Sequence, residues 1–134
     1  MTLIRNIPLL IIPLIIYNIM MLISDINTQL IPPIFSLNLP SSGTWAISGG
    51  DLFIIIGLLL LGIEVFKATR SGSTSIIDHS VSTLVFIIYL IEFISVSDCA
   101  NSIFFILTLM TVIDVIAGFS ISILSAHRDI TVAH

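Results

Sequence analysis

Charged residues are scarce in this sequence. Asp, Glu, Lys and Arg make up 9% of its 134 residues, whereas about a quarter of a typical soluble domain is charged. Hydrophobic residues make up 57%, and the mean hydropathy is +1.21. This composition excludes an ordinary water-soluble domain and predicts an integral membrane protein with the lipid bilayer as a partner.

Basic residues and cysteine are especially rare. Four Lys and Arg against eight Asp and Glu give a formal net charge of −4, so we expect no nucleic-acid partner. The single cysteine, Cys99, excludes a disulfide within the chain. Because Asp98 disfavours its thiolate, we expect an inert thiol, with an intermolecular disulfide as the alternative.

Motifs of catalysis and cofactor binding are also missing. The sequence has no Gly-rich phosphate loop, no Gly-x-Ser-x-Gly elbow and no HExxH pattern. Asp78, His79 and His127 come nearest to a metal-ligand set, but their spacing matches no common metal site. We therefore predict a protein that is not an enzyme and holds neither a cofactor nor a metal.

Long apolar runs are abundant. A membrane-spanning helix needs about 20 mostly apolar residues, and such runs recur four times, at about 7–23, 47–66, 76–96 and 102–124. We predict a single membrane domain over residues 1–134. Its fold class is all-α, an integral membrane bundle of four transmembrane helices with a structured outer loop at 24–50.

The first run contains two prolines. The residues that follow it, 22–25, lack the small-x-small pattern of a signal-peptide cleavage site, so we expect a retained helix. Pro8 should fall in the first turn, where its missing N–H costs little, whereas Pro13 should kink the helix unless its neighbours relieve the strain.

Lys and Arg positions predict the orientation. Arg5, Lys67, Arg70 and Arg128 all fall on one side of the four-span topology, and the opposite loops contain no Lys or Arg. Basic residues stay on the cytoplasmic side of a membrane. We therefore expect a multi-pass protein of the bacterial inner membrane with cytoplasmic N- and C-termini.

The outer loop has an extended pattern. Apolar and polar residues alternate over 35–39, residues 40–43 have turn composition, and residues 45–47 form a second alternating stretch. This pattern predicts a small β-hairpin at the membrane interface. Trp45 is typical of an interfacial anchor, which we favour, and a lid over a substrate entrance is the alternative.

Several polar residues near the ends of the runs have helix-capping patterns. Asp51 is a candidate cap for the second helix, Ser75 with Asp78 for the third, and Asp98 or Asn101 for the fourth.

Three carboxylic acids lie inside the runs, where an unpaired charge costs several kcal/mol. Asp114 lies about 18 Å into the fourth run, near the midplane. Glu92 lies toward the outer end of the third run, and Glu64 toward the cytoplasmic end of the second. These three are the leading candidates for a functional site.

Each acid shares a helix face with small or polar residues. The faces comprise Gly57, Glu64 and Ala68; Asp78, Ser82, Tyr89 and Glu92; and Thr108, Thr111, Asp114, Gly118, Ser122 and Ser125. Gly57 and the small-xxx-small pair Gly118 and Ser122 favour close packing of helices.

These faces support two interpretations. In the first, Asp114 and Glu92 form a proton or cation site, Tyr89 donates a hydrogen bond to it, and Glu64 admits protons. In the second, the acids are structural: Asp114 stays protonated and bonds Thr111 or a neighbouring hydroxyl. Glu92 then pairs with Tyr89 or water, and Glu64 pairs with Lys67.

A third interpretation assigns these acids to contact with another membrane protein. We expect a non-enzymatic membrane component, either a homo-oligomer or an accessory subunit of a larger membrane-protein complex. The alternative is a proton- or cation-coupled translocation element that uses the intramembrane carboxylates.

Three stretches carry a resemblance to one family. The sequences GIEVFKATR at 62–70, SIIDH at 75–79 and DVIAGF at 114–119 are similar to a group of small four-span inner-membrane proteins of bacteria. The resemblance covers the whole chain. It implies the four-span topology and no activity.

Overall fold

The computed structural model describes residues 7–71 and 76–133, with side chains for all of these except 70, 71, 76–79, 121, 122 and 125–133. The described chain is mostly helical. Its elements, in order, are α2 (Ile11–Ile23), α3 (Ile26–Leu30), β1 (Pro33–Asn38), β2 (Thr44–Ser48), α4 (Gly49–Ser71), α5 (Ile76–Ser95), the 3-10 turn η1 (Ser97–Cys99) and α6 (Ser102–Ala133).

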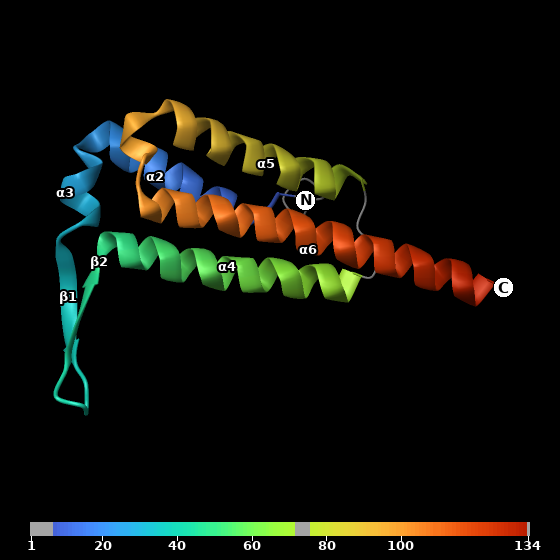
Figure 1. The fold of residues 1–134 in the computed structure, drawn as a ribbon, viewed down its shortest axis with the longest axis horizontal. Helices are drawn as coiled ribbons and strands as arrows, with labels where there is room; N and C mark the ends of the chain where they lie inside the picture. The colour runs from blue at the N-terminus through green and yellow to red at the C-terminus, as the bar shows by residue number, and fades with distance from the viewer. Residues whose placement is uncertain (1–6, 72–75, 134) are drawn as a thin grey trace.

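Helices α2, α4, α5 and α6 lie alongside one another, with the hairpin at one end (Figure 1). Helices α2 and α5 run toward the hairpin end, and α4 and α6 run away from it. Helix α6 packs against both α4 and α5, and its C-terminal turns extend beyond the other helices (Figure 1). The direction of the chain therefore alternates from one long helix to the next.

Two of the described helices are long and apolar enough to cross a membrane, judged by length and composition. These helices cover Gly49–Thr69 of α4 and Ser102–Ser120 of α6. Only 17% of the most apolar 18-residue stretch of the first, and 28% of that of the second, is buried within the chain. Ile11–Ile23 and Ser80–Ser95 are shorter apolar helices. Large apolar side chains are exposed on the outer surfaces of all four helices.

The predicted β-hairpin is confirmed. Strands β1 and β2 pair antiparallel, with Leu37 opposite Trp45 and Asn38 opposite Thr44. In the turn, the Ser42 N–H donates to the Leu39 carbonyl oxygen at 3.0 Å, and Ser42 adopts a positive φ of 69°. The left-handed residue is therefore Ser42 and not the adjacent Gly43.

The loop at 24–50 also contains the short helix α3, which was not predicted from the sequence. Asp25 caps it, since its Oδ1 accepts a hydrogen bond from the Asn27 N–H at 3.0 Å. The Gln29 side chain donates to the Met20 carbonyl oxygen at 2.9 Å and so ties α3 to the end of α2. The loop is therefore a folded helix and hairpin.

Pro13 costs α2 no hydrogen bond, because the helix begins later than predicted. The helix starts at Ile11, which makes Pro13 its third residue. A first-turn residue has no N–H partner inside the helix, so the proline ring costs no hydrogen bond there. Pro8 precedes the helix.

Capping residues define the starts of α4 and α6. Ser48 Oγ accepts from the Asp51 N–H at 3.2 Å, and Asp51 Oδ2 accepts from the Ser48 N–H at 3.0 Å. Asp51 is therefore the third helical residue of a reciprocal capping box and not the cap itself. Asn101 caps α6 through the Phe104 N–H, as expected. Ser75 lies outside the described residues, and Asp78 outside the described side chains.

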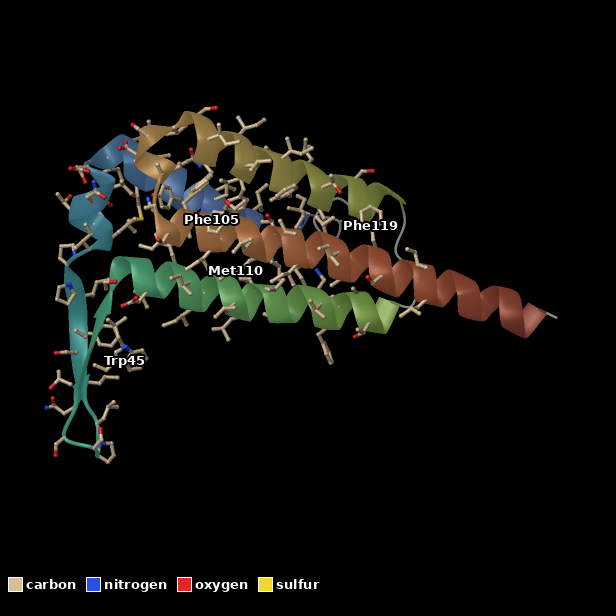
Figure 2. All side chains as sticks on the ribbon, viewed as in Figure 1. Trp45, Phe105, Met110 and Phe119 are labelled. Carbon is tan, nitrogen blue, oxygen red and sulfur yellow. The ribbon has the colours of Figure 1, made fainter. Side chains whose placement is uncertain are left out.

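One apolar core joins all four helices. Tyr17 of α2, Tyr89 of α5 and Phe104 of α6 are completely buried. The Tyr17 ring lies edge-on to Phe53 of α4 and to Phe104, with centroids 5.5 and 4.9 Å apart. Met110 of α6 faces α4 (Figure 2). Short helix α2 is therefore held by aromatic contacts to both α4 and α6.

Candidate functional site

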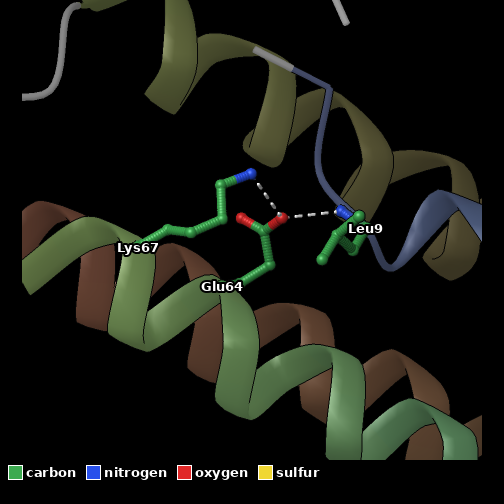
Figure 3. Close-up of polar contacts among 3 residues, drawn as sticks. All are labelled: Leu9, Glu64 and Lys67. Atoms are coloured by element: carbon green, nitrogen blue, oxygen red, sulfur yellow. Dashed lines mark hydrogen bonds and ion pairs between the residues drawn. The ribbon is translucent and has the colours of Figure 1, made fainter. Parts of the chain in front are cut away.

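The carboxylate of Glu64 connects two helices. Its Oε1 accepts a hydrogen bond from the backbone N–H of Leu9 at 2.9 Å and lies 3.7 Å from Lys67 Nζ (Figure 3). Leu9 precedes α2, so its N–H has no partner within the helix. The side chain of Glu64 therefore satisfies a backbone donor 55 residues away in sequence.

The expected pairing of Glu64 with Lys67 is present, but it is the weaker of the two contacts. The Lys67 side chain is 44% exposed, so solvent screens this ion pair to less than about 1 kcal/mol. The Glu64 side chain is only 14% exposed, and its hydrogen bond to Leu9 is charge-assisted. The main role of Glu64 in this fold is to fix the entry of α2.

Removing the Glu64 carboxylate should weaken the bundle. We expect Glu64→Ala to lower the free energy of unfolding by about 1.5–3 kcal/mol, because a hydrogen bond to a charged group is lost. Denaturant titration in detergent micelles measures this change. Glu64→Gln is the matched control, since its amide oxygen still accepts from Leu9, and its cost should be smaller. Equal stability of all three proteins would contradict the assigned contact.

Asp114 lies near Glu64 on the neighbouring helix. It is half-buried on α6, and the charges of Glu64 and Lys67 both act on it. Among the side chains and backbone that the structure describes, no donor forms a hydrogen bond with Asp114. Thr111, a proposed partner, instead donates to the carbonyl oxygen of Thr108 at 2.5 Å.

The expected pair of Asp114 and Glu92 is not formed. Glu92 is three residues from the end of α5, and Asp114 is twelve residues into α6, which places them about 13 Å apart along the bundle. Glu92 Oε2 instead accepts a hydrogen bond from Asn18 Nδ2 of α2 at 3.2 Å. The structure therefore leaves Glu92 at the hairpin end, and it places Asp114 farther along α6, which packs against the helix that carries Glu64.

Tyr89 also differs from expectation. Its hydroxyl donates to the carbonyl oxygen of Leu10 at 2.7 Å, in a buried position, and not to Glu92 or Asp114. Leu10 directly precedes α2. Two side chains therefore fix the start of α2. The Tyr89 hydroxyl binds the Leu10 carbonyl oxygen, and the Glu64 carboxylate binds the Leu9 N–H.

A second polar network ties the hairpin end of the bundle. The Tyr17 hydroxyl donates to the Asp98 carbonyl oxygen at 2.7 Å and accepts from Asn101 Nδ2 at 2.8 Å. Asn18, the next residue, binds Glu92. Tyr17 and Asn18 were not among the site residues predicted from the sequence. Their signal was present, since they are adjacent polar groups in an otherwise apolar helix.

The predicted packing residues have different surroundings. Gly57 is buried, and a Cβ atom there would lie 2.7 Å from Met110 Sδ and 2.9 Å from Leu107 Cδ2 of α6. Gly57 therefore permits close approach of α4 and α6. Gly118 is half-buried on α6. The side chain of Ser122 lies outside the described residues.

Cys99 is enclosed at the hairpin end. It is completely buried in η1, and its Sγ lies 3.8 Å from Met21 Sδ. Burial, with the charges of Glu92 and Asp98 as smaller causes, raises the pKa of the Cys99 thiol from 9.0 to about 12. The thiol is therefore protonated at neutral pH, and a disulfide with a second molecule would require this end of the bundle to open.

Maleimide labelling tests the state of Cys99. A pKa near 12 in place of 9.0 leaves about a thousandth of the usual thiolate at pH 7, so we expect negligible labelling of the folded protein. The rate should rise with pH, because deprotonation produces the nucleophile. Protein unfolded in dodecyl sulfate is the control and should label fully. Rapid labelling before unfolding would show that the thiol is accessible.

Comparisons with protein-family models, curated proteins and solved structures found no match for this chain. Within the described residues, no group of three or more His, Cys, Asp or Glu side chains could hold a metal ion. Described side chains hydrogen-bond α2 and the residues before it to other elements at both ends of that helix: Glu64 and Tyr89 bind at its start, and Tyr17, Asn18, Glu92 and Asn101 form contacts at the hairpin end.

Proposed function

We propose that this chain is a non-enzymatic protein of the bacterial inner membrane, a self-associating component or an accessory subunit of a membrane complex. In this proposal α2, α4, α5 and α6 each cross the bilayer, and both termini are cytoplasmic. The length of α4 and α6 supports it, as does the alternating chain direction of the four helices.

The distribution of exposed side chains also supports membrane insertion. Leu59 on α4, Ile94 on α5 and Ile116 on α6 are 64%, 73% and 59% exposed. Apolar surface of this extent is unfavourable in water and favourable in lipid. A helix in the core of a soluble protein would instead bury most of its apolar side chains.

Hydrogen bonds between the helices support the proposal of a non-enzymatic role. Glu64, Glu92 and Tyr89 are each bound to a protein group, and all three bind the segment from Leu9 to Asn18. Groups used in this way hold helices together. They are not free to act on a substrate.

Asp114 supports an association with another helix. It is a half-buried carboxylate without a hydrogen-bond donor among the described residues. Such a group inside a bilayer costs several kcal/mol unless a donor satisfies it. A transmembrane helix of a second copy or of a partner subunit would supply that donor.

Native mass spectrometry from mild detergent and from lipid nanodiscs tests the association. We expect a defined oligomer or a stoichiometric complex that Asp114→Ala disrupts. Glu92→Gln is the control, because Glu92 bonds within the chain, and it should leave the assembly intact. A monomer in both environments would contradict the proposal.

Reporter fusions test the topology separately. Alkaline phosphatase placed after residue 134 should be inactive in cells, and phosphatase inserted in the turn at 40–43 should be active. The reverse activities would exclude cytoplasmic termini.

A second function, proton- or cation-coupled translocation, is favoured by one observation. Asp114 is a half-buried carboxylate without a hydrogen-bond donor among the described residues, and an ionisable group within a membrane span is typical of a proton or ion pathway. Under this hypothesis, liposomes containing the protein should show a pH-dependent ion flux that Asp114→Asn abolishes. The absence of flux with the unmutated protein would exclude it.

A further inference from the structure

The hairpin has one apolar face and one polar face. The pairs Phe35 with Ile47 and Leu37 with Trp45 lie on one face, since directly opposed residues of an antiparallel pair point the same way. The other face carries the pairs Ser36 with Ala46 and Asn38 with Thr44. Every residue of β1 is exposed. On the apolar face Ile47, at the base of the hairpin, is buried, whereas Phe35, Leu37 and Trp45 are 46%, 46% and 44% exposed. Most of the apolar face is therefore not covered by the helices.

The orientation of the hairpin is specific. It runs across the helix axes at the end of the bundle, beside the start of α4 (Figure 1). The Trp45 side chain projects toward the side along which α4 extends (Figure 2). Strand β2 ends at Ser48, and the candidate span of α4 begins at Gly49. Chain continuity therefore places the hairpin at the level where this span begins.

An apolar groove opens at the base of the hairpin. It has a volume of about 250 Å³ between α2, α3, β1 and α4. Ile16, Ile34 and Ile56 line it and are 42%, 58% and 43% exposed. Gln29 is its one polar lining residue, and its Nε2 is bound to the Met20 carbonyl oxygen. The groove therefore offers a ligand an almost wholly apolar surface.

We propose that the hairpin and this groove form a binding site for a membrane lipid, with an acyl chain in the groove and the apolar hairpin face at headgroup level. The proposal rests on the membrane insertion proposed above. Lipid is the occupant because the surface is uncharged and apolar, continues onto the exposed face of α4, and carries Trp45 at the start of a span. Tryptophan is enriched at membrane interfaces.

Fluorescence of Trp45 tests the position of the hairpin. Trp45 is the only tryptophan in the chain, so its emission reports the hairpin without labelling. In phosphatidylcholine vesicles we expect emission at short wavelength, quenched more strongly by bromines near the headgroup than by bromines near the chain end. Long-wavelength, unquenched emission would place the hairpin in water and overturn the proposal. Short-wavelength emission without quenching would indicate a protein occupant, such as a second copy, and would also overturn it.

Groove-filling tests the acyl-chain site. Ile56→Phe enlarges a groove residue, whereas Ile63→Phe makes the same change at an exposed position of α4 outside the groove. We expect Ile56→Phe to reduce severalfold the fraction of protein that retains phosphatidylcholine in native mass spectrometry, and Ile63→Phe to leave it unchanged. Equal retention by both variants would exclude the groove as the site. The reporter fusions distinguish this failure from a failure of membrane insertion, since they do not depend on bound lipid.

Discussion

Replacement of Tyr17 with alanine should lower the free energy of unfolding by about 3–5 kcal/mol, the range for aromatic residues deleted from a core. Tyr17 is completely buried and contacts the rings of Phe53 and Phe104. Its loss leaves a cavity where α2 meets α4 and α6. It also removes the hydroxyl that joins α2 to the turn before α6.

Tyr17→Phe separates packing from hydrogen bonding. The ring remains, but the Asp98 carbonyl oxygen and Asn101 Nδ2 each lose a partner. Because Asn101 Nδ2 still donates to the Asp98 carbonyl oxygen at 3.1 Å, neither group is left unsatisfied, and we expect a cost of about 0.5–1.5 kcal/mol for each hydrogen bond lost. Denaturant titration in detergent micelles compares both variants with the unmutated protein. A Tyr17→Ala variant as stable as Tyr17→Phe would contradict the central position of the ring.

Replacement of Gly49 with alanine should also be strongly destabilising. A Cβ atom at Gly49 would clash with the backbone carbonyl oxygen of Gln29, at the junction of α3 and α4. Because the obstructing atom belongs to the backbone, a side-chain rotation cannot relieve the clash. We expect a loss of about 3 kcal/mol, the upper part of the range for overpacking.

Gly62→Ala is the matched control for Gly49→Ala. Both glycines lie in α4, but a Cβ atom at Gly62 would have no neighbour within 4 Å. Alanine favours a helix over glycine by about 1 kcal/mol, so this variant should be as stable as the unmutated protein or more stable. The same denaturant titration measures both variants. Equal loss of stability at the two positions would show that the effect is not the clash with Gln29.

The start of α2 depends on side chains from two other helices. The Glu64 carboxylate accepts from the Leu9 N–H, and the Tyr89 hydroxyl donates to the Leu10 carbonyl oxygen. Helix α2 is short and apolar, and it begins only at Ile11. Glu64 and Tyr89, which were predicted as candidate site residues, therefore stabilise the start of α2. The sequence pattern did not indicate this role.

Local patterns were sufficient for the hairpin and for the starts of α4, α5 and α6, but α4 and α6 end at Ser71 and Ala133, beyond the predicted 66 and 124. Alternation over 35–39 with turn residues at 40–43 predicted strands β1 and β2, and Asn101 was a predicted cap. Helix α3 was missed because its five residues are too short for a helical period to be recognised. Pro13 was misjudged because its effect depends on where the helix begins.

The sequence by itself determined the four longer helical segments, the two-faced hairpin and the helix face on which Glu64, Glu92 or Asp114 lies. These features depend on composition and periodicity, which are properties of a single segment of the sequence. Only the tertiary structure decided the partners: Glu64 with Leu9, Tyr89 with Leu10, and Glu92 with Asn18. A helical period gives the face on which a side chain lies, but the group opposite it depends on the order, rotation and offset of neighbouring helices, which the whole bundle sets.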